Sequence, residues 1–189
     1  MTYLIVGILL WAAVHLFKRV TPAGREALAA TVPKGADRGV IAILLFISLA
    51  LIVVGYRQAD FEPVYDPLPG AGHLNNLLMY VAVVLFGMGS SKGRMRSWLR
   101  HPMLTGVLVW GAAHLLVNGD LASLVLFGSM IAWAVVEILI INAREPAWVR
   151  PEPGPVARDI RLLIISAVLF AIIAAIHTWL GRNPFLGSY

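Results

Sequence analysis

Six stretches of the chain are almost continuously apolar, and segments rich in polar residues, glycine and proline separate them. A helix needs roughly 20 residues to cross the hydrocarbon core of a bilayer. The pattern therefore predicts an all-α protein, a polytopic membrane bundle of six transmembrane helices that forms one membrane domain over residues 1–189. The expected spans are 3–17, 40–55, 74–90, 102–117, 121–142 and 162–180. The first, second and fourth are a little short, so we expect flanking residues to snorkel or the bilayer to thin around them.

The composition supports a lipid bilayer as the surroundings of this chain. Hydrophobic residues make up 59% of the sequence and charged residues only 13%, with a mean hydropathy of +0.81. A soluble domain carries about 25% charged residues. The chain has no cysteine, which excludes disulfides, thiolate metal ligands, covalent haem attachment and iron–sulfur clusters. The first 17 residues contain no lysine or arginine, so we expect a retained first helix and not a signal peptide.

Lysine and arginine are distributed very unevenly between the connecting loops. Loops 18–39, 91–101 and 143–161 carry thirteen of them, whereas Arg57 and Arg182 are the two expected on the opposite side. Cytoplasmic loops are enriched in these residues, so both termini are expected to face the periplasm or exterior. The net charge of +5 is explained by these loop residues, so we do not expect a nucleic-acid partner.

A short motif occurs twice, once in the first span and once in the fourth. Residues 11–16 and 110–115 share a tryptophan, an alanine, a histidine four residues after the tryptophan, and a leucine. The first three and last three spans would run in opposite directions through the membrane. The repeat is therefore what an inverted 3+3 duplication would produce.

The two repeated histidines, His15 and His114, are the strongest candidates for a functional site. An ionisable side chain inside a membrane is costly and marks function by default, and histidine is a common ligand of haem iron. Helical rise places the two roughly 14 Å apart along the membrane normal, on opposite halves of the bilayer. Pairing within one half is easier: His15 with His101 near the cytoplasm, and His114 with His177 or His73 near the outer face.

The histidines and their neighbours also allow interpretations that involve no functional site. Histidines at a membrane interface often only bond a carbonyl or a headgroup, most readily His73 and His101 at helix starts, and His177. The tryptophans fit an interfacial belt. Glu137, the carboxylate deepest in a span, is expected to snorkel or to pair with Arg100 or a protonated histidine. No Ser-His-Asp triad, H-E-x-x-H zinc motif or phosphate-binding glycine loop is apparent in the sequence.

The chain resembles the NnrU family of integral membrane proteins over nearly its whole length. The similar segments are residues 14–28, Arg38-Gly39, Gly72-His73, 100–106, 110–120, 126–128 and 175–177. The block from Arg100-His101-Pro102 to Asn118-Gly119-Asp120 is the most specific of them.

The resemblance implies a protein of the bacterial inner membrane linked to denitrification and nitric oxide metabolism. The family includes the plant zeta-carotene isomerase, a haem b enzyme that isomerises a polyene, and its haem ligands match His15 and His114. That enzyme also uses a cysteine at the position of Gly111. The resemblance thus implies haem b as cofactor, with nitric oxide or a hydrophobic small molecule as ligand, and Arg57 or Arg100 pairing with propionates. The candidate cofactor-binding residues are His15, His114, His101, His177, His73 and Arg100, with His15 and His114 as metal ligands.

Two alternatives remain open from the sequence. Arg100-His101-Pro102 followed by Gly106 is similar to the S-adenosylmethionine segment of isoprenylcysteine methyltransferases, but the acidic and basic motif that those enzymes carry later has no counterpart here. The second alternative is a non-enzymatic accessory protein that assists a membrane redox complex.

Overall fold

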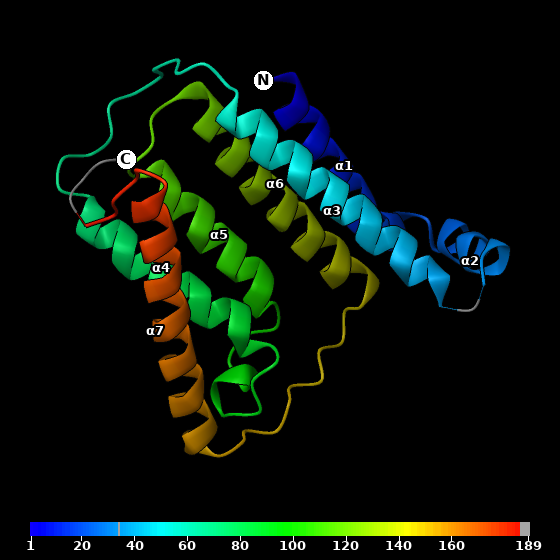
Figure 1. Ribbon diagram of the computed structural model, residues 1–189. Helices are drawn as coiled ribbons and strands as arrows, with labels where there is room; N and C mark the ends of the chain where they lie inside the picture. Colours follow the sequence, from blue (N-terminus) through cyan, green and yellow to red (C-terminus); the bar gives the residue numbers. More distant parts are fainter. Residues whose placement is uncertain (34, 186–189) are drawn as a thin grey trace. The chain divides into compact units, whose positions relative to one another are not determined.

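The computed structural model describes residues 1–33 and 35–185, and the fold within them is all-helical, as the sequence predicts (Figure 1). Each of the six apolar stretches coincides with a helix, although the stretches 74–90, 102–117 and 162–180 extend one or two residues past the helix ends. The elements are α1 (Thr2–Val20), α2 (Pro22–Thr31), α3 (Ala36–Arg57), α4 (Gly72–Met88), the short 3₁₀ helix η1 (Met95–Ser97), α5 (Pro102–Leu115), α6 (Leu121–Arg144) and α7 (Val156–Trp179).

Four of these helices, α1, α3, α6 and α7, are long and apolar enough to cross a membrane, which indicates a multi-pass membrane protein. The expectation that the first two spans are short is wrong, because α1 and α3 run for 19 and 22 residues. Both continue past their apolar stretches into polar flanking residues. The short apolar helices are α4, with 17 residues, and α5, with 14.

The segment between the first two spans was expected to be a loop, yet ten of its residues form α2. Pro22 begins this helix, and proline suits the first helical position because the missing N–H has no partner there in any case. The guanidinium of Arg25 pairs with the carboxylate of Asp37 in the first turn of α3. No residue of α2 is buried, so this ion pair is its main polar anchor.

The chain divides into two compact units, which are described separately. Unit 1 consists of residues 1–63 and 120–129, and unit 2 consists of residues 64–119 and 130–189. Unit 1 therefore contains α1, α2, α3 and the start of α6, and unit 2 contains α4, α5, α7 and the rest of α6. This division does not follow the first three and last three spans, because α4 packs with α5 and α7. The inverted repeat stays a prediction.

In unit 1, α1 and α3 pack antiparallel at very close range (Figure 1). A Cβ atom at Gly7 would lie 2.8 Å from the backbone nitrogen of Ile52, and one at Gly55 would overlap the backbone of Leu4. Small residues at helix interfaces are the usual device for bringing two backbones together in lipid, where apolar side chains gain little by leaving the solvent. The two glycines thus set the distance between α1 and α3.

The start of α6 is capped within unit 1. Asp120 precedes the helix, and its carboxylate accepts hydrogen bonds from the backbone N–H of Ser123 at 2.9 Å and from the Ser123 hydroxyl. The same hydroxyl lies 2.8 Å from the phenol oxygen of Tyr56 on α3. A side-chain acceptor at this position satisfies a backbone donor that the helix leaves open. The cap and the tyrosine together tie α6 to α3.

In unit 2, α4 packs against both α5 and α7 (Figure 1). Gly106 of α5 faces α4, where an added Cβ would lie 2.9 Å from the ring of Phe86. On the other side, the Tyr80 hydroxyl donates to the carbonyl of Leu163 on α7 at 3.2 Å. The buried cluster between them consists of Val84, Leu85, Met88 and Leu162.

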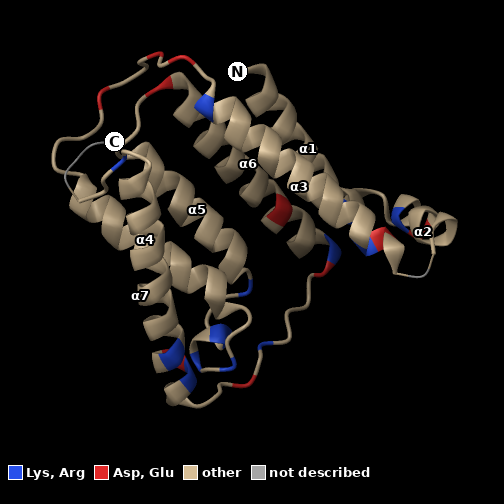
Figure 2. Ribbon diagram, in the orientation of Figure 1, with Lys and Arg blue, Asp and Glu red and all other residues tan. Residues whose placement is uncertain are grey.

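One end of unit 2 is held by a buried carboxylate. Asp159, in the first turn of α7, is 7% exposed and accepts hydrogen bonds from the backbone N–H groups of Arg94 and Met95 at 2.9 and 3.0 Å. Gly93 is required beside it, since a Cβ there would overlap the carboxylate. Figure 2 shows lysine and arginine gathered in this loop and at the start of α7. Both segments were assigned to the same side of the membrane from their charge.

We expect Gly55→Ala to destabilise unit 1 by about 1–3 kcal/mol, because the new methyl group must push α1 away from α3. Gly39→Ala on the same helix is the matched control, since nothing lies within 4 Å of a Cβ there. Denaturation of the purified protein in detergent measures both. Equal stability of the two variants would contradict the close packing.

Asp159→Asn should destabilise unit 2 by about 1–3 kcal/mol, because an amide offers a single oxygen to the two backbone donors. Glu152→Gln, in the exposed segment just before α7, changes the same charge and serves as the control. The expected readout is earlier proteolysis of the 89–101 loop in the Asp159 variant. A cleavage rate like that of the control would show that the carboxylate does not hold this loop.

Candidate functional site

Three histidines within helices make the same local hydrogen bond. The Nδ1 atoms of His15, His114 and His177 lie 2.9, 2.9 and 2.8 Å from the carbonyl oxygen four residues earlier. A carbonyl can only accept, so Nδ1 carries the hydrogen, and in the neutral ring Nε2 carries the lone pair. Histidines that bind metals through Nε2 commonly donate their other N–H in this way. The arrangement suits metal ligation by Nε2.

For the two repeated motifs, the carbonyl that accepts this bond belongs to the tryptophan. The rings of Trp11 and His15 lie 4.3 Å apart between centroids, at an angle of 37°. Those of Trp110 and His114 lie 5.2 Å apart, at 55°. In each copy the indole thus lies beside the imidazole, and the backbone carbonyl of the tryptophan accepts its N–H. The hydrogen bond is the same in both copies, whereas the distance and angle between the rings differ.

The end of α5 that carries His114 is fixed by residues that the sequence did not single out. The Asn118 side chain donates to the His114 carbonyl at 2.8 Å. The Tyr65 hydroxyl contacts the carbonyls of Leu115 and of Asn118, the latter at 2.7 Å. Asn118-Gly119-Asp120 was noted only as part of the family block. The signal that the sequence offered is the glycine at position 119. The structure shows its reason, because a Cβ there would overlap the Tyr65 carbonyl.

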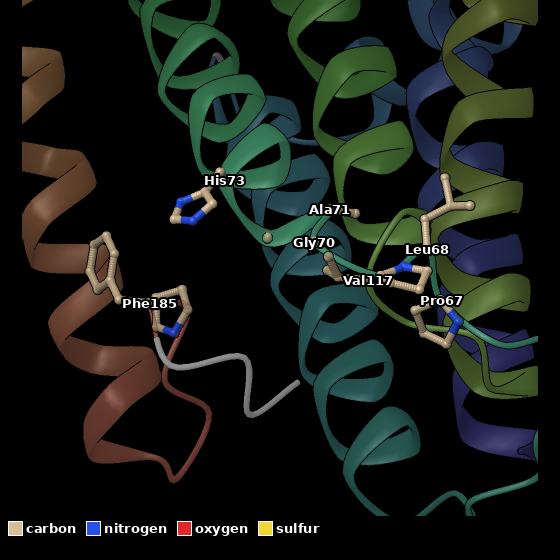
Figure 3. A pocket seen from close by; sticks show the side chains of 10 residues that line it. Pro67, Leu68, Gly70, Ala71, His73, Val117 and Phe185 are labelled. Carbon is tan, nitrogen blue, oxygen red and sulfur yellow. The ribbon is translucent and has the colours of Figure 1, made fainter.

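All three outer-layer histidines lie in unit 2: His73 at the start of α4, His114 on α5 and His177 near the end of α7. His73, at the start of α4, lines a separate pocket of about 350 Å³ with Pro67, Leu68, Val117 and Phe185 (Figure 3). Unit 1 contains a single histidine, His15. The pairing of His114 with His177 or His73 stays a prediction, as does the pairing of His15 with His101, which lie in different units.

Arg100 and His101 have structural partners at the end of α6. His101 Nε2 lies 2.9 Å from the side-chain oxygen of Asn142, so it is the Nε2 atom of this ring that carries the hydrogen. The Arg100 guanidinium donates to the backbone carbonyl of Glu145 just beyond the helix. Arg100 and His101 thus donate hydrogen bonds to oxygen atoms at the C-terminal end of α6. This tautomer is opposite to that of the three helical histidines, and we leave His101 out of the ligand set proposed below.

A haem requires fewer ligands from the protein than a bare metal ion does. Among residues 1–33 and 35–185, no group of three or more His, Cys, Asp or Glu could hold an ion. A haem needs only one or two axial protein ligands, because the porphyrin supplies the others. Glu137 is buried on α6, and within the described residues it does not form a metal-binding group with the histidines.

Comparison with known proteins agrees with the resemblance seen in the sequence. The family model described as NnrU protein matches residues 3–184, which is nearly the whole chain. No curated protein and no solved structure matches the chain. The match includes both copies of the repeated motif and the Arg100–Asp120 block. The chain therefore belongs to the NnrU family.

Proposed function

We propose that this protein is a multi-pass protein of the bacterial inner membrane that binds haem b through histidines within its helices. The observation that carries the proposal is the shared tautomer of His15 and His114, whose Nδ1–H groups are held by the tryptophan carbonyls. That hydrogen bond directs the lone pair to Nε2 and makes the ring a better donor to iron. His177 makes the same bond to the Ile173 carbonyl, so the tryptophans add a ring contact and not the tautomer itself.

In unit 2, His114 would supply one ligand, and His177 is a candidate for a second. Both rings present the same tautomer, and the helices that carry them both pack against α4. The carbonyl network of Asn118 and Tyr65 would hold the His114 turn in place. In unit 1, His15 would supply a single ligand. The two copies of the motif would then serve two separate sites.

The bound haem would supply an iron that can take nitric oxide, pass electrons or assist isomerisation of a polyene. The residues described here would orient the histidine donors. We include a link to denitrification and nitric oxide metabolism because the NnrU resemblance implies it. A thiolate ligand is excluded, because the chain has no cysteine. The acidic and basic motif of the methyltransferases has no counterpart in the sequence, so we do not propose a methyltransferase.

We also propose that all six apolar helices cross the membrane, with both termini outside. Thirteen lysine and arginine residues in loops 18–39, 91–101 and 143–161, against Arg57 and Arg182, support this orientation. The hydrogen bonds from the Arg94 and Met95 N–H groups to Asp159 join two of those basic segments at one end of unit 2. The short helices α4 and α5 would require local thinning of the bilayer.

The purified protein should show a Soret band and a positive pyridine haemochrome test. His15→Ala and His114→Ala should each remove part of the haem, because the proposed sites are separate, and the double variant should remove nearly all of it. His177→Ala should weaken haem retention as His114→Ala does.

His101→Gln is the control for these spectra, since its Nε2–H donates to Asn142 and it is not a proposed ligand. We expect it to keep the haem content of the parent. A parent protein without a Soret band after expression with excess haem would refute the proposal. Complete loss in either single variant would mean one shared iron.

Reporter fusions test the orientation. Alkaline phosphatase, which is active only outside the cytoplasm, should be active when fused within residues 58–71 and inactive within 145–155. The difference follows from the positive charge retained on the cytoplasmic side. Activity in the second fusion would exclude a six-span arrangement with outer termini.

A further inference from the structure

A groove of about 360 Å³ runs between α4 and α7 in unit 2. Its floor is buried, with Val83 and Leu162 being 8% and 9% exposed. Its walls on α7 are open, with Ile165 and Leu169 being 44% and 46% exposed. Apart from Ser166, the lining side chains are apolar. The groove therefore offers a hydrocarbon surface that is open toward the surroundings of α7.

A glycine helps to shape this groove. Gly87 of α4 faces α7, and a Cβ there would lie only 2.7 Å from a methyl carbon of Leu162. Phe86 beside it is half-exposed at 37% and forms part of the α4 wall. Because residue 87 has no side chain, Leu162 fits beneath the groove, and the groove itself stays open.

The groove ends in positive charge. The α7 residues that line it, Leu162, Ile165, Ser166, Leu169 and Ile173, follow helical spacing. One turn earlier on the same face stand Arg158 and Arg161, both exposed. Between them, Asp159 is buried and bonds the backbone of Arg94 and Met95.

The neighbouring loop adds to this charge. Lys92 and Arg94 are exposed, and their loop packs against the start of α7, where the Gly154 N–H donates to the Gly93 carbonyl at 3.3 Å. Figure 2 shows lysine and arginine side by side in this loop and at the start of α7. An apolar channel with several cations at one end is complementary to a molecule with a long hydrocarbon tail and an anionic head.

We propose that an anionic phospholipid binds here, with one acyl chain in the α4–α7 groove and its phosphate at Arg158 and Arg161. Basic residues beside transmembrane helices on the cytoplasmic side are a recurring means of holding anionic headgroups. The site would be a specific one, because the groove adds apolar contact that a basic surface alone lacks. It involves no histidine and is independent of haem binding.

Native mass spectrometry of the purified full-length protein, titrated with phosphatidylglycerol or phosphatidylethanolamine in detergent, tests the site. The parent should retain phosphatidylglycerol preferentially. Arg158→Gln/Arg161→Gln should need roughly tenfold more phosphatidylglycerol for the same occupancy, because two charges near the headgroup are lost. Leu169→Trp should lower retention of both lipids by filling the groove.

Matched controls separate the site from general charge and from misfolding. Arg144→Gln/Arg150→Gln removes the same charge from the end of α6 and the loop after it, and should leave retention unchanged. Val168→Trp places the same ring on α7 outside the groove and should also bind as the parent does. The proposal is overturned if the Arg158/Arg161 variant binds like the Arg144/Arg150 variant, or if the two tryptophan variants behave alike.

Discussion

Backbone hydrogen bonding in an apolar solvent is the constraint on which this structure depends. No water is present in the hydrocarbon region to satisfy a free N–H or C=O, so a spanning segment of this kind must be helical. Breaks in the helices then require dedicated acceptors and donors. Asp159 supplies acceptors to the 93–95 loop, and Asp120 supplies one to the start of α6. The Arg100 guanidinium supplies donors where α6 ends.

Close helix approach is the second requirement, and it is met by glycine. In water, two apolar helix faces attract because they leave the solvent, but in lipid that gain is small. Gly7 and Gly55 instead bring the backbones of α1 and α3 together, and Gly106 does the same between α5 and α4. Each unit thus rests on a few positions at which a single methyl group would be too large.

The apolar helices could be predicted from the sequence, because a helix in the hydrocarbon core of a bilayer must be apolar along its length. It failed at α2, because residues 18–39 were expected to be a loop although Pro22 can begin a helix. The division into two units was also missed. Hydropathy does not distinguish an apolar residue that faces lipid from one that faces another helix, so it could not show that α4 packs with α5 and α7.

For the candidate site, the cost of burying an ionisable group identified His15 and His114, but the tautomer required coordinates. Asn118 and Tyr65 were overlooked because polar residues at a turn normally indicate nothing more than exposure to water. In the structure they complete the bonding of backbone groups at the end of α5. The bond to the tryptophan carbonyl satisfies the imidazole N–H in an apolar setting and leaves the lone pair of Nε2 available to a metal. The arginines at the end of the α4–α7 groove help to set the orientation of the chain and also offer charge to an anionic headgroup. Each feature therefore serves the fold in lipid and also supplies the chemistry on which a proposal rests.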